Sequence, residues 1–131
     1  MTDSALSLLG LALRGGNLAV GEEPVSEACR TGRAKLVLTA ADAAENSVDR
    51  AGRMAELGRV PWIRLPWDKE ALGGALGRKL CAVAALTDRG LASALAEKLI
   101  QTNGGLRPAL EPLLTEKKKP RAEKKPAPRE S

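Results

Sequence analysis

The chain has 131 residues, of which 44% are hydrophobic, so it can form one domain with a sizeable core. It contains no His, Phe or Tyr, and its aromatic residues are Trp62 and Trp67. This composition argues against catalysis by a histidine proton shuttle, and against RNA-binding modules that stack bases on aromatic side chains. The net charge of +5 is uneven: residues 1–101 hold 13 Lys/Arg against 12 Asp/Glu, and residues 102–131 hold eight against four.

Helical and strand patterns alternate along most of the chain. Apolar residues at helical spacing predict helices at residues 4–14, 22–30, 42–58, 68–76 and 88–101. Short apolar runs predict strands at residues 18–20, 34–39, 60–65 and 82–86. Asp42 with Glu45 resembles a capping box for the third helix, and Asp68 and Asp88 are expected to cap the next two. Pro61 indicates a strand start or a sheet edge. The alternation predicts an α/β fold, with a sheet between two helical layers.

The sequence changes character after Gln101. Pro108 and Pro112 are expected to interrupt helix formation, and residues 117–131 are a low-complexity run of Lys, Pro, Ala and Glu. We therefore expect a folded domain over residues 1–101 and a disordered tail over residues 102–131. Such a tail either keeps the protein soluble or serves as a non-specific RNA-binding arm, and the composition favours neither.

No segment predicts export or membrane insertion. The apolar run from Leu6 to Leu13 is too short to span a bilayer, follows Asp3 rather than a basic cluster, and lacks a small-residue cleavage site. Cys29 and Cys81 do not have the spacing of metal ligands, so we expect buried thiols in a reducing compartment. We therefore expect a soluble, cytoplasmic protein with no membrane partner.

Catalytic and cofactor-binding patterns are missing from the sequence. It has no phosphate-binding loop, no GxGxxG motif and no cluster of metal ligands, and a nucleophilic triad would lack its usual histidine. We therefore expect no enzyme activity, no cofactor, no metal site and no small-molecule substrate.

The junction at Gly21 is the most informative local pattern. A short strand, one glycine and the first turn of a helix follow one another over residues 18–25, and such a junction points free backbone N–H groups toward one place. The helix dipole makes that place attractive to anions, although the first turn carries Glu22 and Glu23. Taken alone, the junction is more simply a strand-to-helix connector whose glutamates satisfy the dipole.

Five motifs in order resemble the kink-turn RNA-binding superfamily of ribosomal proteins (seven-Ae and thirty-e). They are LLGLALRGG at residues 8–16, LAVGEE at 18–23, AKLVLTAAD at 34–42, LGGALG at 72–77 and AVAALTDRG at 82–90. Each motif is common by itself, but the five occur at compatible spacing. The resemblance covers roughly residues 4–100, and within the superfamily the chain is most similar to the small bacterial YlxQ-type members.

The resemblance implies a three-layer α-β-α sandwich around a four-stranded mixed sheet, in which two elements at one end bind RNA. In such proteins they hold the bent phosphate backbone and the sheared G·A pairs of a kink-turn. The first element is the glycine turn with the outer face of the second helix, which here correspond to Gly21, Glu22, Glu23, Pro24 and Glu27. The second element is the loop before the last strand, which here corresponds to Gly77, Arg78, Lys79, Leu80 and Cys81.

The first element departs from the archaeal-type motif, which reads Gly-x-Asn-Glu followed three residues later by Lys. Glu23 stands at the Asn position and can accept hydrogen bonds from the N1 and N2 donors of guanine. Pro24 offers no side-chain acceptor, and Glu27 places a negative charge where phosphates should run. The further cations expected to compensate, if they cluster near the site, are Arg14, Arg30, Arg33 and Lys35, and the last three are expected to contact RNA.

Together these patterns predict a non-catalytic RNA-binding protein that recognises a kink-turn or a similar bent RNA containing G·A pairs. Structured ribosomal RNA is the expected partner, and the ribosome is a further candidate. The alternative is a protein-interaction module on the same fold with weakened or lost specific RNA binding, as Pro24 and Glu27 permit. In that case Arg78 and Lys79 belong to a solvated loop, and Trp67 is the better candidate for a partner contact.

Overall fold

The computed structural model describes residues 4–102 and 104–118. The helices are α1 (Ser4–Arg14), α2 (Glu22–Arg30), α3 (Glu45–Gly58), α4 (Lys69–Ala75), α5 (Arg89–Thr102) and α6 (Arg107–Lys118), with a 3-10 turn, η1 (Gly104–Leu106), before the last. The strands are β1 (Leu18–Val20), β2 (Leu36–Thr39), β3 (Trp62–Arg64) and β4 (Val83–Leu86). The alternation predicted over residues 4–101 is therefore confirmed, with boundaries that shift by a few residues. No helix in the described ranges is long and apolar enough to cross a bilayer.

The four strands form one mixed sheet in the order β1-β4-β2-β3. β4 pairs antiparallel with both β1 and β2, and β2 pairs parallel with β3. Every residue of the central strands β2 and β4 is buried, which is expected when helices cover both faces of a sheet. β3 begins just after Pro61 and lies at a sheet edge, as the proline predicted.

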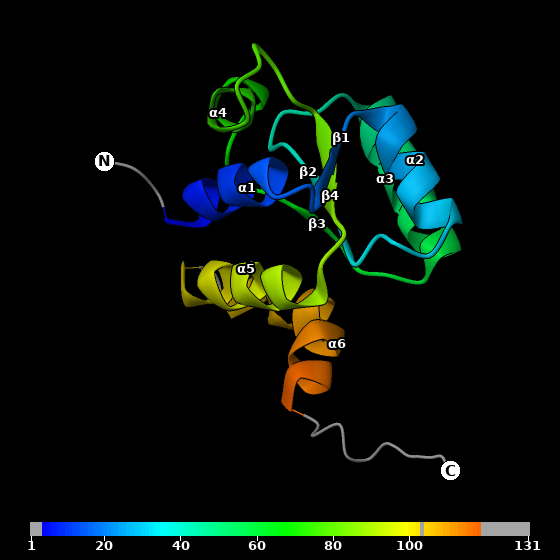
Figure 1. Cartoon of the computed structure of the whole chain (residues 1–131), viewed down its shortest axis with the longest axis vertical. Coiled ribbons are helices and arrows are strands. Elements are labelled where there is room, and N and C mark those ends of the chain that lie inside the picture. The colour runs from blue at the N-terminus through cyan, green and yellow to red at the C-terminus, as the bar shows by residue number, and fades with distance from the viewer. Residues whose placement is uncertain (1–3, 103, 119–131) are drawn as a thin grey trace.

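Helices cover both faces of the sheet, as Figure 1 shows. α2 and α3 pack against each other on one face, where Val25, Ala28 and Cys29 belong to a small core of alanines and valines. α1, α4 and α5 cover the other face over a larger core that is rich in leucine. The expected three-layer sandwich is confirmed. Cys29 and Cys81 are buried free thiols, also as expected, and burial raises the pKa of both.

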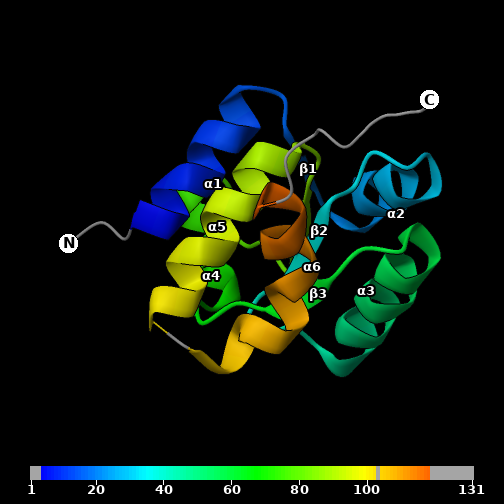
Figure 2. The ribbon, with the colours of Figure 1, turned by 90° about the horizontal axis from the view of Figure 1, so that it is seen from below.

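The prediction that disorder begins at residue 102 is wrong for residues 104–118, which form η1 and α6. α6 packs against α5 (Figure 2), and Leu110 and Leu113 are only 0% and 4% exposed. Pro108 is the second residue of the helix, where a missing N–H breaks no intrahelical bond. Pro112 lies inside the helix, and burial of the two leucines offsets the hydrogen bond that it removes. The expected tail over residues 119–131 lies outside the described residues.

Two of the three predicted helix caps are confirmed. Asp68 and Asp88 each accept a hydrogen bond from the amide three residues later, over 2.8 and 2.9 Å. Asp42 does not cap α3, because that helix begins after Ala44 with no side-chain cap. Instead, Asp42 Oδ1 accepts a hydrogen bond from the Lys69 amide over 2.7 Å. The Asp42 carboxylate therefore ties the chain after β2 to the start of α4.

Candidate functional site

One end of the sheet brings together the two elements that were expected to form the site. Gly21 follows β1 with a φ of 100°, a conformation that strains any side chain. Its amide donates a hydrogen bond to the Val83 carbonyl at the start of β4 over 3.0 Å. Because residues 77–82 lead directly into β4, this bond places the start of α2 beside the end of that loop (Figure 1). We call residues 20–23, 40–42, 66–69 and 77–82 the glycine-turn end.

Hydrogen bonds fix the loops of the glycine-turn end to one another. The Ala40 amide donates to the Ala82 carbonyl over 2.9 Å, and the Cys81 amide donates to the Lys69 carbonyl over 3.0 Å. Lys69 is itself held by the Asp42 carboxylate. The loop before β4 is thus tied both to the chain after β2 and to the first turn of α4. A surface held in this way needs little ordering when it binds a partner.

Close packing beneath the loop sets its height above α4. Gly73 of α4 is buried, and a Cβ atom built on it would lie 2.8 Å from the Cα and N atoms of Leu80. Only glycine allows two backbones to approach so closely. The sequence had indicated Gly73 only as part of a motif, although a glycine inside a helix is itself a signal of close approach. Leu80 is 59% exposed, and Arg78 and Lys79 are exposed next to it.

The three glutamates of α2 have different surroundings. Glu22 is half-buried and accepts a hydrogen bond from Arg50 Nη1 over 2.6 Å, so it links α2 to α3. Glu27 is exposed and forms an ion pair with Arg30, one turn later. Glu23 is exposed at the glycine turn, and its side chain has no hydrogen bond or ion pair with any other residue that the structure describes. Of the three carboxylates, Glu23 is the one available to a ligand.

The structure does not bring Arg30, Arg33 and Lys35 to the glycine-turn end. The nine residues of α2 separate Arg30 from Gly21, which is about 13 Å along the helix. The Lys35 amide donates to the Leu86 carbonyl at the far end of β4 over 2.7 Å. These cations lie at the opposite end of the sheet, which consists of residues 30–35, 58–61 and 86–89. We call it the arginine end.

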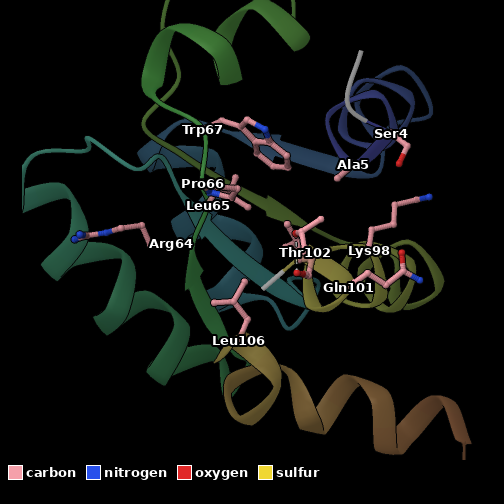
Figure 3. Close-up of a pocket in the computed structure, with 11 residues that line it drawn as sticks. Ser4, Ala5, Arg64, Leu65, Pro66, Trp67, Lys98, Gln101, Thr102 and Leu106 are labelled. Atoms are coloured by element: carbon pink, nitrogen blue, oxygen red, sulfur yellow. Dashed lines mark hydrogen bonds between the residues drawn. The ribbon is translucent and has the colours of Figure 1, made fainter. Parts of the chain in front are cut away.

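A cavity of about 680 Å³ lies between α1, α5, η1 and the connection from β3 to α4 (Figure 3). Its wall includes Leu65, Leu106 and the half-buried indole of Trp67. The Arg64 guanidinium and the Lys98 ammonium extend away from that indole in Figure 3, and the lining also includes the polar residues Ser4, Gln101 and Thr102. In the described ranges, no group of three or more His, Cys, Asp or Glu residues could hold a metal ion. The proposed contact of Trp67 with a partner stays a prediction.

Sequence relatives share most of the chain. Residues 3–96 match the model of the ribosomal protein L7Ae/L30e/S12e/Gadd45 family. The RNA-binding protein YlxQ of Bacillus subtilis (strain 168) is 35% identical over 92 residues, which cover 70% of this chain and 91% of that protein. The RNA-binding protein YlxQ of Enterococcus faecium is 38% identical over 61 residues, which cover 47% of this chain and 59% of that protein.

Two solved structures are similar to this one. A protein with unknown function from Bacillus halodurans C superposes with a TM-score of 0.69 at 30% identity, over 75% of this chain and 98% of that chain. The 15.5kD RNA binding protein of Giardia lamblia superposes with a TM-score of 0.59 at 21% identity, over 79% of this chain and 92% of that chain, a likeness of fold alone. The chain therefore belongs to the ribosomal protein L7Ae/L30e/S12e/Gadd45 family, as a member of the bacterial YlxQ type.

Proposed function

We propose that this protein is a non-catalytic RNA-binding protein of the cytoplasm that recognises a kink-turn or a similar bent RNA containing G·A pairs. Its natural partner would be structured ribosomal RNA. The family membership and the names of the YlxQ relatives support RNA binding. The observation that carries the proposal is the hydrogen bond from Gly21 to Val83, because it places the glycine turn beside the loop of residues 77–82.

Recognition would combine shape with hydrogen bonding. The first turn of α2 has backbone N–H groups without intrahelical acceptors, and an anionic phosphate can accept their hydrogen bonds. The exposed carboxylate of Glu23 would accept hydrogen bonds from the N1 and N2 donors of a guanine in the bend. Arg78 and Lys79 would neutralise phosphates on the other side of the same bend. No step of this mechanism requires a covalent change in the RNA.

The ion pair between Glu27 and Arg30 bears directly on the unfavourable charge of Glu27. Because the Arg30 guanidinium neutralises that carboxylate, an RNA backbone crossing the outer face of α2 meets a pair of opposite charges rather than a lone anion. Both side chains are more than half exposed, at 61% and 53%, so solvent screens the pair and a phosphate can displace it.

The test is a comparison of two RNAs with the full chain. One contains a kink-turn and the other is the same duplex without the bulge, and both are titrated over a series of salt concentrations. Basic residues outside the site attract both RNAs alike, so the ratio of the two affinities isolates specific recognition. We expect tighter binding of the kink-turn at every salt concentration. Equal affinities would overturn specific recognition.

A paired variant tests whether the loop before β4 contacts the RNA. Changing Arg78→Gln together with Lys79→Gln should weaken binding of both RNAs and lower the salt slope by about one unit for each cation that meets a phosphate. Changing Arg53→Gln together with Lys98→Gln removes the same charge from α3 and α5, and should have a smaller effect. Equal effects of the two double variants would argue that the loop before β4 does not contact the RNA.

A second candidate function rests on Leu80, whose apolar side chain is 59% exposed at the glycine-turn end. An exposed leucine on a fixed loop is suited to a protein partner, and specific RNA binding would then be weak or lost. The test is a pull-down from cell extract with and without RNase. Partners that survive RNase and disappear with Leu80→Ser would favour this candidate over RNA recognition.

A further inference from the structure

The arginine end gathers cations from three separate segments of the chain. They are Arg30, Arg33, Lys35, Arg59 and Arg89. In the same segments the sequence has a single carboxylate, Asp88, whose side chain caps α5. Glu27, just outside these segments, forms an ion pair with Arg30 and leaves the other four cations in excess. The excess of positive charge in this part of the molecule was not expected as a separate surface, because residues 30–35 were expected to belong to the other end.

Backbone hydrogen bonds hold these segments together. The Arg33 amide donates to the Ala28 carbonyl over 2.9 Å, which folds the loop of residues 31–35 back onto α2. The Val37 amide donates to the Pro61 carbonyl over 2.9 Å, so the start of β2 lies beside the chain that follows α3. The cations therefore stand on fixed backbone, and their relative positions do not depend on a mobile loop.

A cavity of about 190 Å³ lies among these segments. Lys35, Arg59 and Arg89 line it, together with the backbone of two glycines and with Pro112 and Leu113 of α6. Basic residues from the loop before β2, from the end of α3 and from the start of α5 thus border one hollow. Three basic residues around one hollow are an arrangement suited to a phosphate group.

The backbone of Arg59 supplies an independent observation. Among the non-glycine residues that the structure describes, Arg59 alone has a positive φ, with φ 59° and ψ 43°. Glycine or asparagine is usual at such a left-handed position after a helix. An arginine there indicates that its side chain, rather than its backbone preference, suits the position.

Helix dipoles do not explain the cluster. Arg30 and Arg59 stand at the C-terminal ends of α2 and α3, where a cation is favourable. Arg89, however, is the first residue of α5, where the helix dipole opposes a cation. Lys35 lies next to β2 rather than at a helix end, and its ammonium contacts only the Gly32 carbonyl at 3.4 Å among the hydrogen bonds of the described residues.

We propose that the arginine end is a second binding site for the phosphodiester backbone of RNA, separate from the glycine-turn end. The two ends of the sheet face in opposite directions (Figure 1), so a second RNA segment has access to the arginine end while the glycine-turn end is occupied. α6 also ends on this side, and the sequence that continues from it, residues 119–131, holds five Lys/Arg against two Glu. The choice of RNA as the polyanion rests on the proposed function.

The experiment uses the full chain with Lys35→Gln and Arg59→Asn combined. Asparagine tolerates the left-handed backbone and removes the charge, so the thermal midpoint is expected to stay the same or rise. The matched control is again Arg53→Gln with Lys98→Gln, which removes one Arg and one Lys from outside both ends. Each protein is titrated with the kink-turn RNA and with the unbulged duplex over a series of salt concentrations.

We expect the Lys35/Arg59 variant to bind both RNAs on the order of tenfold more weakly, with a salt slope lower by about 0.9 for each lost phosphate contact. The ratio of the two affinities should be unchanged, because that ratio belongs to the glycine-turn end. A loss of RNA affinity no greater than that of the control variant would overturn the proposal. A fall in the ratio of kink-turn affinity to duplex affinity would also overturn it. If the protein does not recognise the kink-turn, the wild type binds the kink-turn RNA and the unbulged duplex equally well. The Lys35/Arg59 variant should still bind both RNAs more weakly than the wild type.

A bridging measurement tests the second RNA segment directly. A donor-labelled kink-turn RNA and an acceptor-labelled duplex are mixed with one protein, and energy transfer reports their simultaneous binding. Transfer is expected with the wild type and the control variant, and it should be lost with the Lys35/Arg59 variant. Absence of transfer with the wild type, at concentrations that saturate each RNA separately, would show that the two ends do not bind RNA at once.

Discussion

The glycine-turn end and the arginine end of the same sheet are built on different principles. The segments of the glycine-turn end carry three cations and four carboxylates, and hydrogen bonds between loops together with the Gly73 contact determine their shape. The segments of the arginine end carry five cations and one carboxylate around a small hollow. Shape discriminates between RNAs, whereas charge attracts all of them. The comparison suggests that specificity and general affinity are separated by the length of one helix.

The largest effect is expected from removing the buried anchor of α6. Leu110→Ala should lower the free energy of unfolding by about 2–5 kcal/mol, because it leaves a cavity in the core. It should also loosen α6 at the arginine end, where Pro112 and Leu113 line the hollow. Urea unfolding measures the first effect, and RNA titration should show weaker binding with an unchanged ratio of kink-turn to duplex.

The control for that variant is Ala109→Gly, at an exposed position of the same helix. It tests helix propensity alone and should cost about 1 kcal/mol. If Leu110→Ala cost no more than this, α6 would not be part of the core.

A smaller change should break the glycine-turn end alone. Gly73→Ala places a methyl group 2.8 Å from the Leu80 backbone, so the loop before β4 must move. We expect a loss of about 1–3 kcal/mol in stability from overpacking. We also expect the preference for the kink-turn to fall, while binding of the unbulged duplex stays the same.

Gly74→Ala is the matched control, because a Cβ atom there meets nothing within 4 Å. Alanine should stabilise this helix position by up to about 1 kcal/mol and leave both RNA affinities unchanged. A loss of the kink-turn preference in both variants would mean that helix α4, rather than the Leu80 contact, controls recognition.

Charge reversal on the helix between the two ends should sharpen the comparison further. Glu27→Lys breaks the pair with Arg30 and adds a cation where phosphates should run. We expect tighter binding of the kink-turn, by about fivefold, and a salt slope steeper by about one unit. Asp49→Lys on the exposed face of α3 makes the same charge change elsewhere. An equal gain in both variants would mean that Glu27 does not face the RNA.

The smallest expected effect concerns pH and does not involve RNA. Burial raises the pKa of the Cys29 and Cys81 thiols above their ordinary value of 9.0. The unfolded chain therefore releases these protons at a lower pH than the folded protein does. Their contribution to stability is fully present below pH 9 and is lost as pH rises through the folded pKa values.

Urea unfolding at about pH 8 and at about pH 10 measures this loss of stability. The variant with Cys29→Ala and Cys81→Ala is less stable at both, because it loses buried volume. The free energy of unfolding of this variant should nevertheless fall less between the two pH values than that of the wild type. An equal fall would show that other groups cause all of the alkaline destabilisation.

The core elements could be predicted because local patterns determine them. The inward face of α2, with Val25, Ala28 and Cys29, follows from helical periodicity, and it is buried as expected. α6 was missed because Pro108 and Pro112 disfavour a helix, whereas burial of Leu110 depends on contacts with distant elements.

The site was harder to predict than the fold, since its contacts are long-range. Asp42 matches a local capping pattern, yet its partner, Lys69, lies 27 residues away. The same holds for the approach of Gly73 to Leu80, which depends on the path of a loop. The division between the two ends, however, could have been deduced. Residues 21–23 lie at the start of α2 and residues 30–35 lie at its end, and a helix of nine residues separates its two ends by about 13 Å.

Both outer strands of the sheet are short, and this matters when many copies share one RNA. β1 and β3 each have three residues, and β3 follows a proline, which cannot donate a backbone hydrogen bond. Sheet edges of this length offer few unpaired N–H and C=O groups to a neighbouring chain. Copies crowded along a nucleic acid therefore have little backbone with which to join their sheets, and crowding should not promote β-type aggregation.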